Sequence, residues 1–207
     1  MEVINKWLFT NPLFYIIIIS SLAVIIIYKL FYPRIVGWFG EKYTKDELKK
    51  LPKEYKVIND VLIEVNGTTH QIDHVVVSKY GIFCIETKQY NGFITGSKWD
   101  KNWVRHLGKN KYKCINPIRQ NYGHVKSLSE LLDIDIANIY NIVCFTGNTK
   151  YRINDDGETV RYNNLVNKIL SFHNVIIKNT EEIVSNIKKY NIKDNTIRSE
   201  HNKKRIN

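Results

Sequence analysis

The 207-residue sequence contains little cysteine and lacks the cysteine pattern of a disulfide-bonded protein. Its three cysteines, Cys84, Cys114 and Cys144, form no Cys-x-x-Cys pair, and their odd number leaves no complete disulfide framework. Cys84 and Cys144 lie in apolar runs, where a free cysteine usually packs as a small apolar side chain. The sequence therefore indicates a reducing compartment and favours core packing of these thiols over a redox or metal site.

Charge is absent from residues 7–28, and the centre of this segment is apolar apart from two serines. A helix needs about 20 such residues to cross a bilayer core, and the aromatic residues at both ends are placed like interfacial belts. A cleaved signal peptide is the alternative, but no small-x-small cleavage site follows and the preceding flank contains an acid. We therefore expect a short flank at residues 1–6 and an uncleaved membrane anchor at residues 7–32, ending at Tyr32-Pro33.

Basic residues flank this segment unequally. Lys29, Arg34, Lys42 and Lys45 follow it, whereas Lys6 and the terminal amine precede it. Because cytoplasmic flanks carry the excess of Lys and Arg, the sequence predicts a single-pass protein of the cell membrane whose domain faces the cytoplasm. The cysteine usage agrees with that orientation.

The remaining chain is long enough for one domain with its own core. We expect a juxtamembrane linker at residues 33–39, a folded domain at residues 40–190 and a mobile basic polar tail at residues 191–207. Lys and Arg outnumber Asp and Glu by 31 to 20, which suits phosphate-bearing partners or an anionic membrane surface. We expect no small-molecule cofactor, and the oligomeric state is left open.

The expected secondary structure mixes helices and strands. Apolar, β-branched runs predict strands, and turns with Asn-Gly or another glycine join several of them as hairpins. Helix formers closed by proline, or opened by a capping residue, predict helices. The expected helices begin near Gly40, Asn116-Pro117 and Thr180, and the expected strands cover residues 55–65, 71–78, 82–88, 139–145 and 174–177, with another hairpin whose tip is at residues 107–111.

Three ionisable residues, Asp73, Glu86 and Lys88, occur in strands that otherwise have a buried pattern. Glu86 and Lys88 are two apart, so their side chains leave the same face, and Asp73 lies across the hairpin. Two converging carboxylates and a backbone carbonyl form a hard-oxygen site that suits Mg²⁺ or Mn²⁺. The alternative is an internal ion pair in which Lys88 neutralises Glu86 and Asp73 only ends its strand.

These residues also resemble a known family, the nuclease-related domain (NERD) family, which is placed with the PD-(D/E)xK nuclease superfamily. The resemblance is carried by Gln71-Ile72-Asp73-His74, Gly81-Ile82-Phe83 and Ile85-Glu86-Thr87-Lys88, and further by Gly40-Glu41, Asn91-Gly92 and Asn116-Pro117-Ile118-Arg119-Gln120. It extends from about Gly40 to Phe145. It departs from the wider superfamily at Ile72, where many members have proline. It implies a restriction-endonuclease-like α/β fold, a mixed sheet with helices on both faces, and the apolar strands support that fold independently.

The same resemblance implies a metal-dependent hydrolase of phosphodiester bonds in nucleic acid, with DNA favoured over RNA. The roles that it implies are metal carboxylates for Asp73 and Glu86, a metal-binding backbone carbonyl for Thr87, a catalytic lysine for Lys88, and further site residues in Glu41 and Gln120. An acid in the first turn of a helix would explain Glu41 equally well. The alternative function is a non-catalytic docking module for nucleic acid or protein on the same fold.

The tract at residues 98–113 mixes cations with aromatic rings, as single-strand binding surfaces do. A solvated hairpin has the same composition, so both interpretations stay open. The candidate nucleic-acid contacts are Lys98, Lys101, Trp103, Arg105, Lys109 and Lys111. Two histidines near the motifs, His74 and His124, are expected to pack or to lie at the surface.

Overall fold

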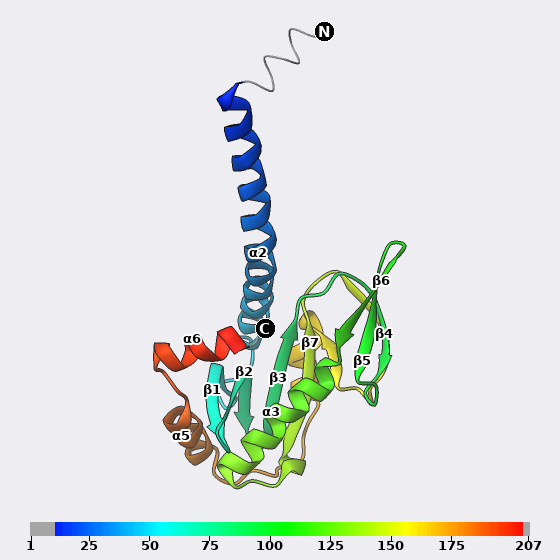
Figure 1. Cartoon of the computed structure of the whole chain (residues 1–207). Coiled ribbons are helices and arrows are strands. Elements are labelled where there is room, and N and C mark those ends of the chain that lie inside the picture. Colours follow the sequence, from blue (N-terminus) through cyan, green and yellow to red (C-terminus); the bar gives the residue numbers. More distant parts are fainter. Residues whose placement is uncertain (1–10, 205–207) are drawn as a thin grey trace. The chain divides into compact units, whose positions relative to one another are not determined.

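The N-terminal part of the chain is one long helix. The computed structural model describes residues 11–204 (Figure 1), so the expected flank at residues 1–6 and the start of the anchor lie outside the described residues. Helix α2 (Pro12–Leu48) contains a segment that is long and apolar enough to cross a membrane. Residues 33–39 are helical, which differs from the expected end at Tyr32-Pro33 and the expected linker. Proline removes one backbone donor, which weakens a helix without obliging it to end.

The chain divides between Phe39 and Gly40 into two units, and the second unit contains two sheets. The main sheet has the strand order β1-β2-β3-β7-β9. Its members are β1 (Lys56–Val65), β2 (Thr68–Ser78), β3 (Gly81–Lys88), β7 (Ile139–Phe145) and β9 (Thr159–Arg161). β1, β2 and β3 are antiparallel, whereas β7 pairs parallel with β3 and β9 parallel with β7. The strands expected from residues 55 to 88 and at residues 139–145 are confirmed.

The small sheet has the order β6-β5-β4-β8, where we expected a single sheet. Its members are β4 (Gly92–Ser97), β5 (Asn102–Leu107), β6 (Asn110–Ile115) and β8 (Thr149–Asn154). The chain passes from the main sheet into the small sheet at Gly92, the first residue of β4. The φ of Gly92 is +94°, and a Cβ there would lie 2.2 Å from the His106 carbonyl oxygen. Only glycine fits that turn without strain. The fold is therefore mixed α/β with two mixed sheets.

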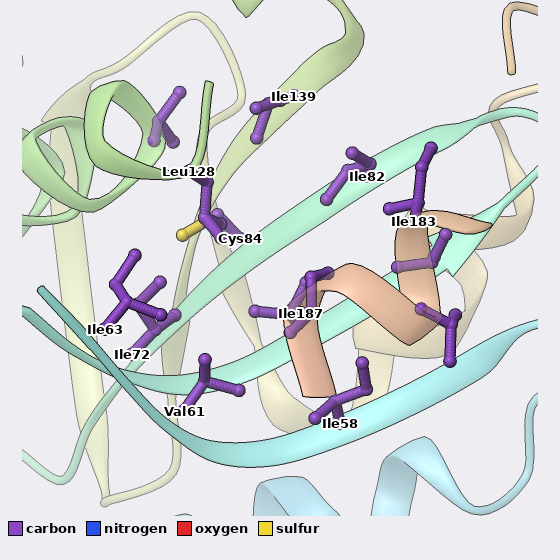
Figure 2. Close-up of a cluster of buried hydrophobic side chains, with 14 of the residues drawn as sticks. Ile58, Val61, Ile63, Ile72, Ile82, Cys84, Leu128, Ile139, Ile183 and Ile187 are labelled. Atoms are coloured by element: carbon purple, nitrogen blue, oxygen red, sulfur yellow. The ribbon is translucent and has the colours of Figure 1, made fainter. Parts of the chain in front are cut away.

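Helices cover both faces of the main sheet. On one face, α3 (Pro117–Leu132) and α5 (Thr180–Tyr190) contribute Leu128 and Ile187 to a cluster with Cys84 (Figure 2). On the other face, the end of α2 and α4 (Leu165–Leu170) pack Leu48 and Ile169 into a second cluster. β2 and β3 are buried on both sides, as their apolar sequences predict. The short 3-10 turns η1 (Ile136–Asn138) and η2 (Tyr162–Asn164) precede β7 and α4.

The C-terminal region differs from expectation in two places. Residues 174–177 are irregular, although the N–H groups of Ile176 and Ile177 both bind the Lys79 carbonyl. The expected polar tail contains helix α6 (Asn195–Lys204), which is held against β1. Arg198 donates two hydrogen bonds of 2.8 and 2.9 Å to the Asp60 carboxylate. Composition alone does not reveal this contact because Asp60 lies more than a hundred positions earlier.

Candidate active site

The β2–β3 ladder ends beside a group of charged residues. Its last pair at this end joins His74 to Ile85, so Asp73 and Glu86, which would form the next pair, lie where the strands separate. The Thr87 N–H donates a 2.8 Å hydrogen bond to Asp73 Oδ2, so a carboxylate occupies the place of a strand acceptor. The register therefore brings Asp73 to the Glu86–Thr87 segment, as the sequence predicts.

Glu86 is the central acceptor of this site and is only 2% exposed. Its Oε1 accepts hydrogen bonds from Lys88 Nζ at 2.5 Å and from Gln120 Nε2 at 2.8 Å. Its Oε2 lies 3.7 Å from His124 Nε2. Gln120 and His124 are four apart on α3, so one helix face presents both to Glu86.

Asn116 fixes the start of α3. Its side-chain oxygen accepts hydrogen bonds from the first backbone N–H groups of the helix, and Pro117 follows at the first helical position, as expected. Its side-chain amide donates to three carbonyls of the β4–β5 turn, those of Ser97, Lys98 and Asp100. One buried side chain thus caps α3 and ties it to the small sheet.

Asn121 fixes the same helix to the main sheet. Its amide donates to the Cys84 carbonyl at 2.8 Å, to Asn141 Oδ1 at 2.7 Å and to the Ile142 carbonyl at 3.2 Å. Because these acceptors lie on β3 and β7, α3 cannot slide along the sheet without losing them. Nothing in the sequence marks Asn121 as a site residue except its place one residue after Gln120.

The end of α2 approaches the site at Gly40. A Cβ there would lie 2.8 Å from Thr146 Oγ1, closer than real side chains allow. One turn later, Thr44 Oγ1 accepts a hydrogen bond of 3.1 Å from Thr87 Oγ1. Glu41 follows Gly40 directly, and its charge contributes to raising the pKa of Asp73. Gly40 and Glu41 lie inside α2, so the helix start expected near Gly40 is wrong, and Glu41 is not an acid in the first turn of a helix. Its effect on Asp73 places it near the site.

The site contains more negative than positive charge. Burial, then the Glu86 and Glu41 carboxylates, raise the pKa of Asp73 well above its ordinary value, against the Thr87 N–H and Lys88. Burial alone would lower the pKa of Lys88, but the neighbouring Glu86, Tyr90 and Asp73 outweigh it and raise that pKa. Lys88 therefore stays protonated, and the single ammonium does not balance the carboxylates.

A divalent cation suits this donor chemistry. Among residues 11–204, no group of three or more His, Cys, Asp or Glu is arranged around a common metal position. Mg²⁺ sites, however, commonly use one or two carboxylates and retain several waters. Asp73 and Glu86 supply two such carboxylates, and the raised pKa of Asp73 reflects negative charge that a cation would neutralise. The residues present thus fit Mg²⁺ or Mn²⁺.

Trp103 and Arg105 share the inner face of the small sheet, and Trp103 corrects an expectation. Its ring is 0% exposed, and its Nε1 donates to the Ser97 carbonyl, so it offers no surface for a base. The Arg105 guanidinium lies 5.5 Å from the ring centre of Tyr90, which follows Lys88 by two residues. Arg105 therefore lies toward the site, and Trp103 is a core residue.

The four lysines proposed as nucleic-acid contacts lie in different places. Lys98 pairs with Asp156 and its ammonium lies 4.7 Å from the centre of the Trp99 ring. Lys101 is exposed in the β4–β5 turn, Lys109 is exposed at the β5–β6 tip, and Lys111 is exposed on β6. The expected hairpin is confirmed, and of these lysines Lys98 is paired with an acid while the other three are exposed.

His74 and His124, which were expected to pack or to lie at the surface, have different environments. His74 is 2% exposed, its Nδ1 lies 2.7 Å from Asn59 Oδ1, and burial lowers its pKa to about 4. It packs as expected. His124 instead borders Glu86, and its spacing from Gln120 was the signal in the sequence that could have placed it there.

Comparisons with known proteins agree with this geometry. The family model described as nuclease-related domain (NERD) matches residues 36–146, slightly more than half of the chain. A protein of Bacillus anthracis that is described only as uncharacterized is 34% identical over 176 residues, which cover 82% of this chain and 83% of that protein. No solved structure matches the chain significantly. The chain therefore belongs to the nuclease-related domain family.

Proposed function

We propose that this chain is a membrane-anchored, metal-dependent nuclease that hydrolyses phosphodiester bonds in nucleic acid, DNA in preference to RNA. The observation that carries the proposal is the convergence of Asp73, Glu86, Lys88 and Gln120 where β2 and β3 separate. Family membership supports a nuclease-related domain, to which we assign a restriction-endonuclease-like fold. The assignment of catalytic roles is ours.

The residues have distinct roles in this proposal. Asp73 and Glu86 would hold Mg²⁺ or Mn²⁺, and the Thr87 carbonyl would be a third oxygen donor. A bound divalent ion would acidify a water and stabilise negative charge on the phosphate. Lys88, kept cationic by Glu86, donates to a phosphate oxygen or orients the attacking water. Gln120 restrains the Glu86 carboxylate through its 2.8 Å hydrogen bond.

The anchor is assigned from composition. The apolar segment of α2 supports a single crossing at residues 7–32. Residues 7–10 lie outside the part of the chain that the structure describes. The excess of Lys and Arg after this segment supports a domain on the cytoplasmic side. That side would give the domain access to intracellular nucleic acid.

The test uses the full-length chain in detergent micelles with titrated Mg²⁺ or Mn²⁺. We expect cleavage of DNA by the wild type and its loss in Asp73→Ala, Glu86→Ala and Lys88→Ala. Glu64→Ala, which removes an exposed carboxylate from β1, is the matched control and should cut normally. Calorimetry should show metal binding that is lost with Asp73 and Glu86. Equal cutting by the wild type and all three site variants would contradict the catalytic assignment.

One observation favours a second candidate. Glu86 Oε1 is satisfied within the protein by Lys88 and Gln120, as in a structural ion pair. A non-catalytic module that docks nucleic acid or protein at the membrane would keep this pair. It predicts salt-sensitive binding that survives Glu86→Ala, weakens when Lys101, Arg105 and Lys109 are neutralised together, and occurs without cleavage at any metal concentration.

A further inference from the structure

The small sheet has one buried face and one open face. Ile94 and Trp103 point inward and pack with Ile118, Val143 and Phe145. Because side chains alternate along a strand, the residues on either side of Ile94 and Trp103 point to the opposite side. We call this opposite side the outer face. It points away from the cluster that joins the small sheet to α3 and β7.

The strand register arranges the outer face in two rows that cross all four strands. The first row, from β6 to β8, is Lys111, His106, Phe93 and Lys150. The second row is Lys113, Val104, Thr95 and Arg152. Each row begins and ends with a cation, and an aromatic pair occupies the middle of the first. The cations on β6 lie three strand spacings, about 14 Å, from the cations on β8, and the two rows are about 7 Å apart.

The side chains of these rows are accessible and are not neutralised locally. The four cations are exposed, and Phe93 is 37% exposed with its ring centre 5.8 Å from that of His106. Neither row contains an Asp or Glu. The groove between the β4–β5 turn and α3 differs, because its Lys98 is paired with Asp156 and Glu158 also lines it. The outer face is therefore the place where positive charge is left for a partner.

We propose that the outer face binds single-stranded nucleic acid, with phosphates on the cations of β6 and β8 and bases stacked on Phe93 and His106. Phosphate neutralisation by Lys and Arg supplies affinity without sequence preference, and aromatic rings stack on any unpaired base. A duplex keeps its bases stacked on each other and would leave the central rings unused. This inference does not rest on phosphodiester hydrolysis, because the outer face is separate from Asp73 and Glu86.

The test measures binding of labelled oligothymidylate by fluorescence anisotropy. The full-length chain is held in nanodiscs of phosphatidylcholine with EDTA, so that neither lipid charge nor cleavage interferes. Replacement of Lys111, Lys113, Lys150 and Arg152 by Gln should weaken binding at least tenfold. It should also lower the slope of log affinity against log salt by about 3, since each phosphate contact to a single strand contributes about 0.7. Phe93→Ala should weaken binding about tenfold and leave that slope unchanged.

The matched control removes the same charge elsewhere. Lys53, Lys178, Lys188 and Lys189 are exposed and lie outside both sheets, and their replacement by Gln should change binding less than twofold. Equal loss in the two quadruple variants would overturn the proposal. Preference for duplex DNA would overturn it too, as would wild-type binding only to phosphatidylserine vesicles. Wild-type binding without cleavage in Mg²⁺ would contradict the nuclease proposal alone.

Discussion

The main sheet carries the charges of the candidate site where β2 and β3 separate, with Glu86 buried, whereas the small sheet carries most of its cations on its outer face. Glu86 is 2% exposed and depends on Lys88 and Gln120 for hydrogen bonds. Lys150 and Arg152 are exposed to water. A buried charge needs a partner, and an exposed one costs little. The difference supports our proposals that the first region holds a cation and that the second binds a polyanion.

The largest expected effect tests the buried side of this comparison. Lys88→Met should lower the free energy of unfolding by about 3 to 5 kcal/mol, because it leaves the Glu86 carboxylate buried without its cation. Thermal unfolding of the full-length chain in micelles with EDTA should show a Tm lower by about 10 °C. Lys88→Met combined with Glu86→Gln should recover much of the loss. A single variant as stable as the wild type would mean that Glu86 is not buried as described.

A second variant compares two tryptophans of the small sheet region. Trp103→Ala should cost about 3 kcal/mol, because it empties a fully buried site in the core beneath the sheet. Trp99→Ala is the control, since Trp99 is 76% exposed, and it should change stability by less than about 0.5 kcal/mol. The Tm values of the two variants compare these costs. A larger cost at Trp99 would reverse the assignment of inner and outer positions.

A smaller effect of opposite sign is expected at Asp73. Burial and the Glu86 and Glu41 carboxylates raise the pKa of Asp73 in the fold above its unfolded value. Its contribution to stability is therefore greatest below the unfolded pKa and is lost as pH rises through the folded pKa. Asp73→Asn should stabilise the metal-free protein by about 1 kcal/mol near neutral pH, and cleavage should be lost. Tm should be measured in EDTA from acid to neutral pH. A stability difference that grew toward acid would contradict the sign.

The smallest effect is expected on the outer face of the small sheet. Lys150→Gln with Arg152→Gln should change the free energy of unfolding by less than about 0.5 kcal/mol, because both side chains are solvated. Nucleic-acid binding by the same variant should nevertheless weaken. Unfolding by heat and oligothymidylate anisotropy are measured on one preparation. A large loss of stability would show that these cations support the sheet and would remove the contrast with Lys88.

Local chemistry made much of the fold predictable from sequence. Asn66-Gly67 specifies a tight turn, and Asn116-Pro117 specifies a helix start, because in each case the signal and the structure involve neighbouring residues. The β2–β3 hairpin likewise places Asp73 opposite Glu86 by a short turn. The central part of the candidate site was predictable because its carboxylates and lysine lie within one hairpin.

Long-range contacts explain most of what the sequence did not reveal. The parallel pairing of β4 with β8 joins segments more than 50 residues apart, so no local pattern separates the small sheet from the main one. Trp103 was misjudged because its burial depends on Gly96, whose absent Cβ would lie 2.2 Å from the indole ring. His124 reaches Glu86 only because Asn121 and Asn116 fix the rotation of α3.

The side chain of Asn116 has a consequence for where a bound strand would be cut. Its amide holds the β4–β5 turn while its oxygen holds the helix that presents Gln120, so the two regions are coupled through a buried residue with 0% exposure. A strand bound on the small sheet would then reach Asp73 and Glu86 at a constant offset. The cleavage products would then share a characteristic length, which is set by the fold and not by the base sequence.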